Sequence, residues 1–275
     1  MKMFCSKQIG FFSLVSNLWK NRQLIIQMTL RDVIGRYQGS FLGLLWSFLN
    51  PVLMLCVYTF FFSVVFKARW LGGSGSKAEF ALILFSGLII FNFFAECLNR
   101  APSLMQSNVN FIKKIIFPLE ILPVITMLSA LFHLLVSLCV WICFYIVIFG
   151  IPHIEILLFP IVILPLLFII LGITWMLSSL GVYLRDVSQV VGTVVSILMF
   201  LSPIFYPIES LPELFQGIVR LSPVTLAVEQ ARSVMYWGNG IDWVLWGYYM
   251  MISVCVSWLG YVWFQKTRKG FADVI

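Results

Sequence analysis

Charged side chains are scarce in this sequence. Asp, Glu, Lys and Arg make up 11% of its 275 residues, whereas hydrophobic residues make up 61%. Soluble domains contain about 25% charged residues, so the composition excludes an ordinary soluble protein. The mean hydropathy of +1.01 agrees with this, and the sequence therefore indicates an integral membrane protein.

A nucleotide-binding motif is also missing. The stretch "LGGSGSK" at residues 71–77 is rich in glycine, but it lacks the Gly-Lys-Ser/Thr ending of a phosphate-binding loop and follows no strand. We expect a flexible external loop here. Since no other stretch offers a nucleotide site, the chain is not expected to hydrolyse ATP by itself.

Ionisable residues are rare inside the apolar runs, where Glu96, Glu120 and His133 occur. Proton-driven transporters place carboxylates or histidines in series, and the absence of a series argues against a secondary transporter or an ATPase-independent flippase. The lack of a carboxylate cluster or His–acid pair argues against a glycosyl or acyl transferase. We expect Glu96 to form a structural pair with Arg100, His133 to be a hydrogen-bonded packing residue, and Glu120 to have no special role.

Metal-ligand patterns are absent as well. Cys139 and Cys143 share a helix face, but no further ligand lies near them. Buried thiols in an apolar helix behave as small hydrophobic groups. The sequence therefore predicts neither a metal site nor a catalytic residue, and nothing in it indicates a nucleic-acid partner.

Six long apolar runs account for the hydrophobic excess. A helix needs about 20 residues to cross a hydrocarbon core of about 30 Å, and lipid cannot satisfy an open backbone. Continuous apolar runs also lack the alternation of barrel strands. The predicted fold is an all-α integral membrane protein with six transmembrane helices, at about residues 41–66, 80–99, 121–149, 156–184, 187–208 and 243–264.

The basic residues predict the orientation. With a cytoplasmic N-terminus, thirteen of the eighteen Lys and Arg residues fall on the cytoplasmic side, as the positive-inside rule requires. Both termini are then cytoplasmic. The chain divides into a tail with an interface helix at 1–40, a six-span domain at 41–264 and a C-terminal tail at 265–275.

Residues 18–38 predict an amphipathic helix in the membrane interface. Trp19, Ile26, Leu30, Val33 and Tyr37 recur at helical spacing. Basic residues of such a helix face anionic lipid headgroups, and Asp32 and Arg36 have the spacing of a stabilising pair within one helix. The alternative is a solvated juxtamembrane helix. The residues assigned to the interface helix are Arg31, Asp32 and Arg36.

A ridge of small residues follows this helix. Gly35, Gly39, Gly43 and Ser47 lie four residues apart. Such ridges let helix backbones approach closely in membranes. The neighbour can belong to the same subunit or to a second copy.

Residues 203–240, on the predicted external side, are moderately apolar but too interrupted by proline to cross the membrane. Ser210 and Glu213 fit a capping box, and Ser222 with Pro223 fits an N-cap followed by a first-turn proline. We expect two short external re-entrant helices before the last span.

Aromatic residues are abundant, with 26 Phe, 10 Trp and 9 Tyr. Rings that line a pore can stack on the apolar faces of sugars, whereas rings that face lipid or the core only pack. For any single ring, packing is the simpler interpretation. The residues predicted to line a substrate channel are Trp46, Tyr58, Phe62, Phe205 and Tyr206.

Four stretches carry a resemblance to a known family. "RDVIGRYQGSFLGLLWSFLNP" at 31–51, "NFIKKIIFPLEILP" at 110–123, "YLRDV" at 183–187 and "FADVI" at 271–275 occur in the family's order. The chain resembles the type-2 ABC transporter permeases that export O-antigen, teichoic acid or capsule, and the first span leans towards the O-antigen branch. Capsule or teichoic acid export remains the alternative.

The resemblance implies a bacterial inner-membrane permease domain at 41–264. It implies a homodimer joined to two copies of a separate ATPase, which binds the ATP and Mg²⁺, so that this chain needs no cofactor. The substrate is then a lipid-linked polysaccharide.

A chain without a nucleotide site must receive mechanical work through its cytoplasmic surface. The longest predicted cytoplasmic connection is residues 100–118, and a tight turn follows at 185–186. The residues predicted to couple to the ATPase are Asn110, Lys113, Lys114, Arg185 and Asp186.

Overall fold

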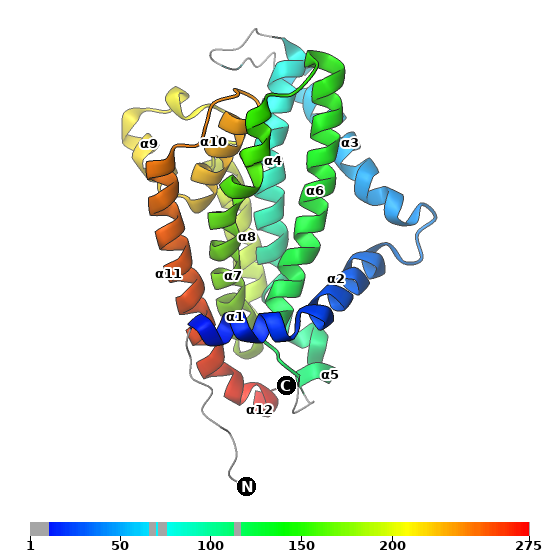
Figure 1. Cartoon of the computed structure of the whole chain (residues 1–275), viewed down its shortest axis with the longest axis vertical. Coiled ribbons are helices and arrows are strands. Elements are labelled where there is room, and N and C mark those ends of the chain that lie inside the picture. Colours follow the sequence, from blue (N-terminus) through cyan, green and yellow to red (C-terminus); the bar gives the residue numbers. More distant parts are fainter. Residues whose placement is uncertain (1–10, 66–69, 71–75, 113–116, 275) are drawn as a thin grey trace.

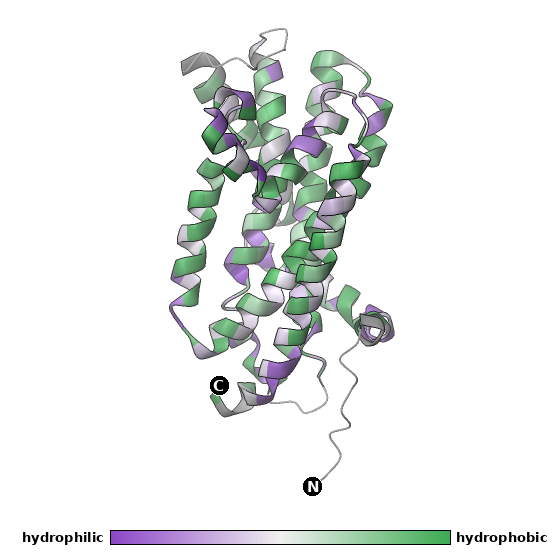
Figure 2. Cartoon of the chain, turned by 90° about the vertical axis from the view of Figure 1, so that its left-hand side faces the viewer, coloured by the Kyte–Doolittle hydropathy of each residue, from purple (hydrophilic) through white to green (hydrophobic). Residues whose placement is uncertain are grey.

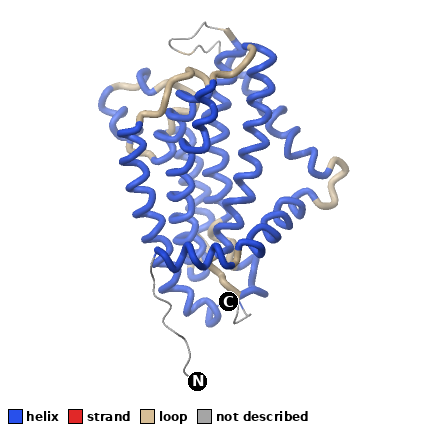
Figure 3. Tube along the Cα trace, in the orientation of Figure 1, coloured by secondary structure: helices blue, strands red, loops and turns tan. Residues whose placement is uncertain are grey.

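The computed structural model describes residues 11–65, 70, 76–112 and 117–274, and all of its regular elements in this part are helical (Figure 3). The long helices run side by side along the long axis of the molecule (Figure 1). Hydrophobic colouring extends along most of their length (Figure 2). The α-helical fold expected from the apolar runs is confirmed.

Five helical segments are long and apolar enough to cross a membrane, in the part that the structure describes. The first is a composite of a 3-10 turn, an α-helix and a π-helix. The five segments are Gly43–Phe62 in η1, α3 and η2, and the helices α4 (Lys77–Arg100), α6 (Ile121–Phe149), α7 (Phe159–Tyr183) and α11 (Trp243–Thr267). α3 itself is Trp46–Tyr58 and η2 is Thr59–Val65.

The span predicted at 187–208 is shorter than expected. α8 covers Val187–Leu201, only 15 residues, which gives a length of about 22 Å. Ser202 has an extended backbone, with φ −79° and ψ 146°. The residue before a proline is pushed away from helical geometry, so Pro203 explains why the helix ends here although the sequence stays apolar.

α4 lies at the centre of the bundle, where α6, α7, α8 and α10 pack against it. It contributes the buried side chains of Leu82, Ile83, Leu88 and Phe94 to the main core. By contrast, α3 buries few of its residues, Ser47 and Leu55. α3 is therefore the least supported of the long helices within a single chain.

α7 and α11 make the closest helix contact. A Cβ on Gly172 would lie 2.5 Å from the backbone oxygen of Val256, and a Cβ on Gly260 would overlap the backbone of Gly172. Small residues allow this approach in membranes. The predicted ridge at 35–47 has no such role within the chain, because no atom lies within 4 Å of a Cβ built on Gly35, Gly39 or Gly43.

The N-terminal segment forms two helices instead of one. α1 (Phe11–Lys20) lies across the end of the bundle that also carries α12 (Phe271–Val274), and α2 (Arg22–Tyr37) leads outwards to a turn before α3 (Figure 1). Gly39 and Gly43 adopt φ of 87° and 52° at this turn, a conformation that glycine adopts without steric cost. We call the end of the bundle that carries α1 and α12 the α12 end.

The apolar side of α2 differs from the predicted one. Val33 is buried, but Ile26 and Leu30 are 56% exposed, and the buried neighbours are instead Ile25 and Met28. α2 thus has apolar residues towards the bundle and also away from it. The amphipathic pattern predicted for 18–38 described only part of this arrangement.

Two short helices occupy the opposite end, as expected for 203–240. α9 covers Glu213–Arg220 and α10 covers Pro223–Met235. The predicted capping box is wrong, because Pro212 holds the N-cap position and the Ser210 hydroxyl donates to the Pro207 carbonyl. Pro223 does begin α10, although Ser222 makes no side-chain cap bond.

The remaining elements are short. They are η1 (Gly43–Leu45), η3 (Gln106–Asn108), α5 (Val109–Ile112), η4 (Ile154–Leu158), η5 (Ile208–Ser210) and η6 (Arg268–Gly270).

Candidate functional site

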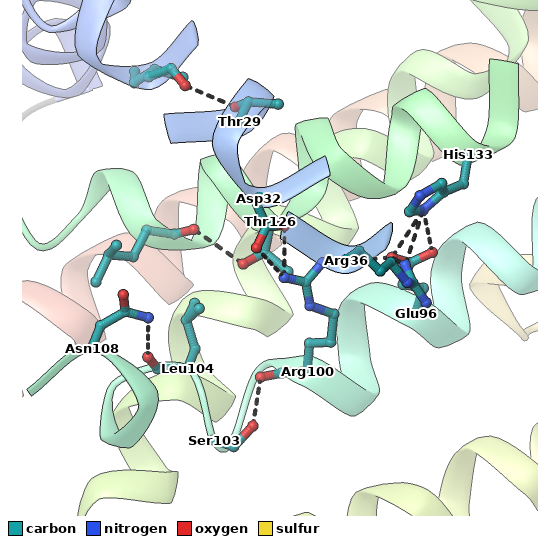
Figure 4. Close-up of polar contacts among 12 residues, drawn as sticks. Thr29, Asp32, Arg36, Glu96, Arg100, Ser103, Leu104, Asn108, Thr126 and His133 are labelled. Atoms are coloured by element: carbon teal, nitrogen blue, oxygen red, sulfur yellow. Dashed lines mark hydrogen bonds and ion pairs between the residues drawn. The ribbon is translucent and has the colours of Figure 1, made fainter. Parts of the chain in front are cut away.

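A charged network joins α2 to α4 near the α12 end. Nη2 of Arg100 donates to both carboxylate oxygens of Asp32, at 2.8 and 2.7 Å. Arg36 donates to Glu96, four residues before Arg100 on the same face of α4 (Figure 4). Each helix therefore supplies one acid and one base, and the two charge pairs cross between the helices.

The pair predicted between Glu96 and Arg100 forms within α4, but the pair predicted between Asp32 and Arg36 within α2 does not. Asp32 faces Arg100 instead of Arg36, and the contact between Glu96 and Arg100 is the longer one, at 3.6 Å. α2 and α4 run in opposite directions (Figure 1), which sets acid against base at both positions. The matching four-residue spacing at 32/36 and 96/100 was the sequence signal for this arrangement.

His133 belongs to the same network, so the expectation of a hydrogen-bonded histidine is confirmed, with charged partners that the sequence did not indicate. Its Nδ1 lies 3.0 Å from Oε2 of Glu96 and 3.1 Å from Nη1 of Arg36. An Nδ1–H group donating to the carboxylate fits the first contact. Glu96 is 16% exposed in its side chain, and three partners from α2, α4 and α6 surround it.

A groove lies beside this network. Two adjoining cavities of about 530 and 290 Å³ share Arg31, Asp32 and Arg100 as lining residues. The larger one also contacts Gly35 and Arg36. The smaller one adds the polar side chains of Ser103, Ser107, Asn108 and Thr126. Arginines together with hydroxyl and amide groups are suited to hold an anionic group.

The three residues assigned to the interface helix do not all face outwards. Asp32 and Arg36 bind α4, as described above, whereas Arg31 is exposed and its guanidinium lies 5.9 Å from the ring centre of Phe111. Two of the three residues therefore attach α2 to the bundle instead of to lipid headgroups.

The predicted coupling segments lie together at the α12 end. Asn110 is exposed on α5, and Arg185 and Asp186 are exposed in the turn between α7 and α8. Gln106 donates to the Gly181 carbonyl at 2.8 Å, which ties the long connection to the end of α7. Lys113 and Lys114 lie outside the described residues.

Glu120 forms a second polar junction at this end, contrary to the expectation that it has no special role. It is 1% exposed and accepts hydrogen bonds from Asn17 on α1 and, at 2.8 Å, from Arg268 after α11. Its backbone carbonyl accepts from Trp175 Nε1 at 3.0 Å. A buried carboxylate is costly without partners, and these partners join α1, α6, α7 and the C-terminal segment.

Three of the five predicted channel aromatics come together. Phe62 stacks on Phe205 with a centroid distance of 5.4 Å, and Tyr58 lies 6.5 Å from Phe62. Phe200, at the end of α8, is 6.0 Å from Phe205. We call Tyr58, Phe62, Phe200 and Phe205 the aromatic cluster.

The other two predicted rings lie elsewhere. The Tyr206 hydroxyl donates to the carbonyls of Phe200 and Leu201, at 3.0 and 3.1 Å, and so closes the end of α8. Trp46 begins α3, about three turns before Tyr58. It makes no ring contact with the cluster among the described residues.

α8 presents a face that sequence reasoning missed. Gln189, Thr193 and Ser196 are exposed and lie on the same side as Phe200, whereas Val191 and Val195 on the other side are buried. The Thr193 and Ser196 hydroxyls donate to carbonyls of their own helix at 3.0 and 2.9 Å. The spacing of polar residues within 187–200 was the available signal.

The relatives agree with a transport role. The chain is 26% identical to the O-antigen export system permease protein RfbA of Myxococcus xanthus over 264 residues, which cover 95% of this chain and 99% of that protein. It is 24% identical to a protein of the same name from Klebsiella pneumoniae, over 92% of this chain and 95% of that protein.

A family match covers most of the chain. A family described as "ABC-2 type transporter" matches residues 23–236, which include α2, the charged network, the aromatic cluster and α8. The matched region is well over half of the chain. With its five long apolar helices and this match, the protein is a multi-pass membrane transport subunit that belongs to the ABC-2 type transporter family.

Proposed function

We propose that this chain is the membrane subunit of an ATP-driven exporter that moves a lipid-linked polysaccharide, O-antigen, across the bacterial inner membrane. Two relatives that match nearly the whole chain are named as O-antigen export permeases. In the proposed complex, two copies of the chain join two copies of a separate ATPase, which binds the ATP and Mg²⁺.

The proposed topology has six crossings. α8 and the segment that follows it make the fifth, and α9 and α10 stay in the outer leaflet as re-entrant helices. An even number of crossings is supported by the position of α1 and α12 at the same end (Figure 1). Basic residues gather at that end, among them Arg36, Arg100, Lys266 and Arg268, which favours a cytoplasmic location.

The exposed polar face of α8 is the observation that carries the proposal. Polar residues in membrane segments face the protein interior or a water-filled cavity. Gln189, Thr193 and Ser196 lie on a surface that no other described element covers. Two such faces in a dimer would line a hydrated path for a sugar chain, with the aromatic cluster at its outer end.

The groove between α2 and α4 suits the other end of the substrate. A lipid-linked glycan carries its anionic group at the membrane boundary, where Arg31, Arg36 and Arg100 line the larger cavity. α2 lies in the cytoplasmic interface in this proposal. The network to Glu96 and His133 would then connect head-group binding to the central helices.

Deletion of the gene tests the function directly. We expect surface O-antigen to disappear while lipid-linked O-antigen accumulates inside, and the wild-type gene to restore export. A matched variant with Thr193→Val and Ser196→Val should insert and bind the ATPase but export less, because the path loses polar groups. Persistent surface O-antigen in the deletion strain would refute the proposal.

A further inference from the structure

Arg232, on α10, is a buried cation whose hydrogen bonds go mainly to backbone. It is 2% exposed. Nη2 donates to the Ile204 carbonyl at 2.7 Å, Nη1 donates to the Pro203 carbonyl, and Nε donates to the Ile83 carbonyl at 3.2 Å. One side chain thus joins α10 to α4 and to the chain that leaves α8.

The backbone at 203–204 needs these donors. α8 ends at Leu201, and the next three residues are non-helical and buried. Buried carbonyls outside regular structure must find other partners, and in a membrane water does not supply them. The guanidinium, with five donors in a planar fork, binds two successive carbonyls.

The site is built around the guanidinium. A Cβ on Gly87 would lie 2.8 Å from Nη2 of Arg232, so α4 carries a glycine where the side chain crosses it. On another side, Cζ lies 4.5 Å from the ring centre of Trp70, a cation–π contact. A side chain at position 87 would therefore force the guanidinium to shift from its place beside the carbonyls.

The held backbone carries the aromatic cluster. Phe205 directly follows Ile204, and its ring stacks on Phe62 and lies close to Phe200. If the Ile204 carbonyl moves, the ring of Phe205 moves with it. The hydrogen bonds of Arg232 to Pro203 and Ile204 therefore act on the position of Phe205 through the backbone.

We propose that Arg232 is a positioning residue that keeps the outer end of the export path closed, by fixing the backbone of Pro203 and Ile204 so that Phe205 stays on Phe62. This inference rests on the proposed function, because it assigns the aromatic cluster to the outer end of that path. Release of the two carbonyls then opens the end without unfolding the bundle.

Chemical labelling of a thiol at position 204 tests the proposal. Ile204 is fully buried, and so is the native Cys97 on α4, which reports general loosening. The other five cysteines are replaced by serine, Ile204→Cys is introduced, and the full chain is kept in its complex with the ATPase. A membrane-permeant maleimide is added, so that the reagent can reach both ends of the bundle, and the labelled site is identified by mass spectrometry.

Two variants break the contact in different ways. Gly87→Ala displaces the guanidinium but leaves Arg232 in place, and Arg232→Lys keeps the charge but removes the planar fork. The matched controls are Gly247→Ala, at a helical glycine with no atom within 4 Å, and Arg220→Lys, at an exposed arginine.

We expect both test variants to speed labelling at position 204 by about tenfold, the effect of losing one hydrogen bond to a charged group, while Cys97 stays unlabelled. The controls should label at the parent rate. Unchanged labelling at position 204 in both variants, or equal labelling of Cys97, would overturn the proposal.

The result is separable from the test of the proposed function. Labelling at position 204 depends on the local structure and not on which substrate is exported. If the deletion strain loses surface O-antigen but labelling is unchanged, the role of Arg232 is wrong and the exporter stands. If the deletion strain keeps its surface O-antigen, the exporter is wrong whatever the labelling shows.

Discussion

Arg100 donates to both carboxylate oxygens of Asp32 through one nitrogen, at 2.8 and 2.7 Å, and so joins α4 to α2. The two side chains come from positions 68 residues apart in the sequence. Both are about one-third exposed, which weakens the attraction because solvent screens it. The pair is nevertheless one of two crossed contacts that attach α2 to the bundle.

A double-mutant cycle measures this pair. Asp32→Asn and Arg100→Gln should each lower the free energy of unfolding, with a coupling of about 1 kcal/mol between them, as measured for partly exposed pairs. Thermal unfolding in detergent provides the measurement. Arg31→Gln combined with Asp32→Asn is the control and should be additive. Additive costs for Asp32 and Arg100 would contradict the pairing.

Replacing Glu120 should lower the free energy of unfolding more than breaking the pair of Asp32 and Arg100. Glu120→Ala removes the buried carboxylate that accepts from Asn17 and Arg268. Hydrogen bonds to a charged group are worth on the order of 2 kcal/mol, and Arg268, which is 32% exposed, regains some hydration. Glu120→Gln retains an acceptor and should cost less. Glu213→Gln, at an exposed position on α9, is the control. A thermal shift for Glu120→Ala no larger than that of the control would show that the junction contributes little.

The aromatic cluster should affect export more than assembly. Each stacked ring is worth about 1 kcal/mol, so Tyr58→Ala and Phe62→Ala should each reduce surface O-antigen while the ATPase still copurifies. Phe60→Ala, at a ring 56% exposed on the same segment, is the control. Normal export by both test variants would mean that these rings only pack.

Charge reversal at the long connection tests coupling. Lys113→Glu with Lys114→Glu should repel an acidic partner surface, although single exposed charges act weakly. We expect correct insertion, loss of ATPase binding or of stimulated hydrolysis, and loss of export. Lys266→Glu with Lys269→Glu changes the charge equally at the same end. Normal export by a correctly inserted Lys113/Lys114 double variant would reject the two lysines as coupling residues.

Glu229 predicts a pH dependence of stability. Burial raises the pKa of its carboxyl above the ordinary value, while Arg232 opposes this shift and Glu209 adds to it. Because the pKa of Glu229 is higher in the folded protein than in the unfolded chain, protonated Glu229 favours folding. This contribution to the free energy of unfolding is complete below the pKa of the unfolded chain, and it is lost as the pH rises through the pKa of the folded protein. Ionised Glu229 therefore costs stability at pH 7.

The variant Glu229→Gln isolates this effect, because it keeps an oxygen for Arg232 but does not titrate. Its melting temperature relative to the parent should be highest near pH 7 and should fall as the pH is lowered through the folded pKa. Other groups titrate in both proteins and cancel in the difference. A difference that stays constant between pH 7 and pH 4 would contradict the prediction.

Composition and hydrophobic run length were enough to predict the helical membrane fold, and the helices at four of the six predicted spans to within three residues at each end. The end of α8 was missed because hydropathy continues past Pro203, whereas the backbone does not. The two short helices at 213–235 were expected, since proline and serine mark their starts even where the detailed caps differ.

Contacts of the candidate site were predicted only where the two residues lie close together in the sequence. Tyr58 and Phe62 share a helix face, so their proximity follows from the sequence. The contacts of Asp32 with Arg100 and of Arg232 with Pro203 join positions distant in sequence, and helical periodicity says nothing of which helices become neighbours. Glu120 was underestimated because a charge at a helix boundary has the same pattern whether it is solvated or buried.

The glycine contact between α7 and α11 restricts how the protein can change shape. With Gly172 and Gly260 backbone to backbone, these helices cannot slide past each other without a steric clash. Packed cores respond to force by moving as rigid bodies. α7 and α11 therefore form a fixed frame, and we expect the lightly packed α3 and the short α8 to move against it in a transport cycle.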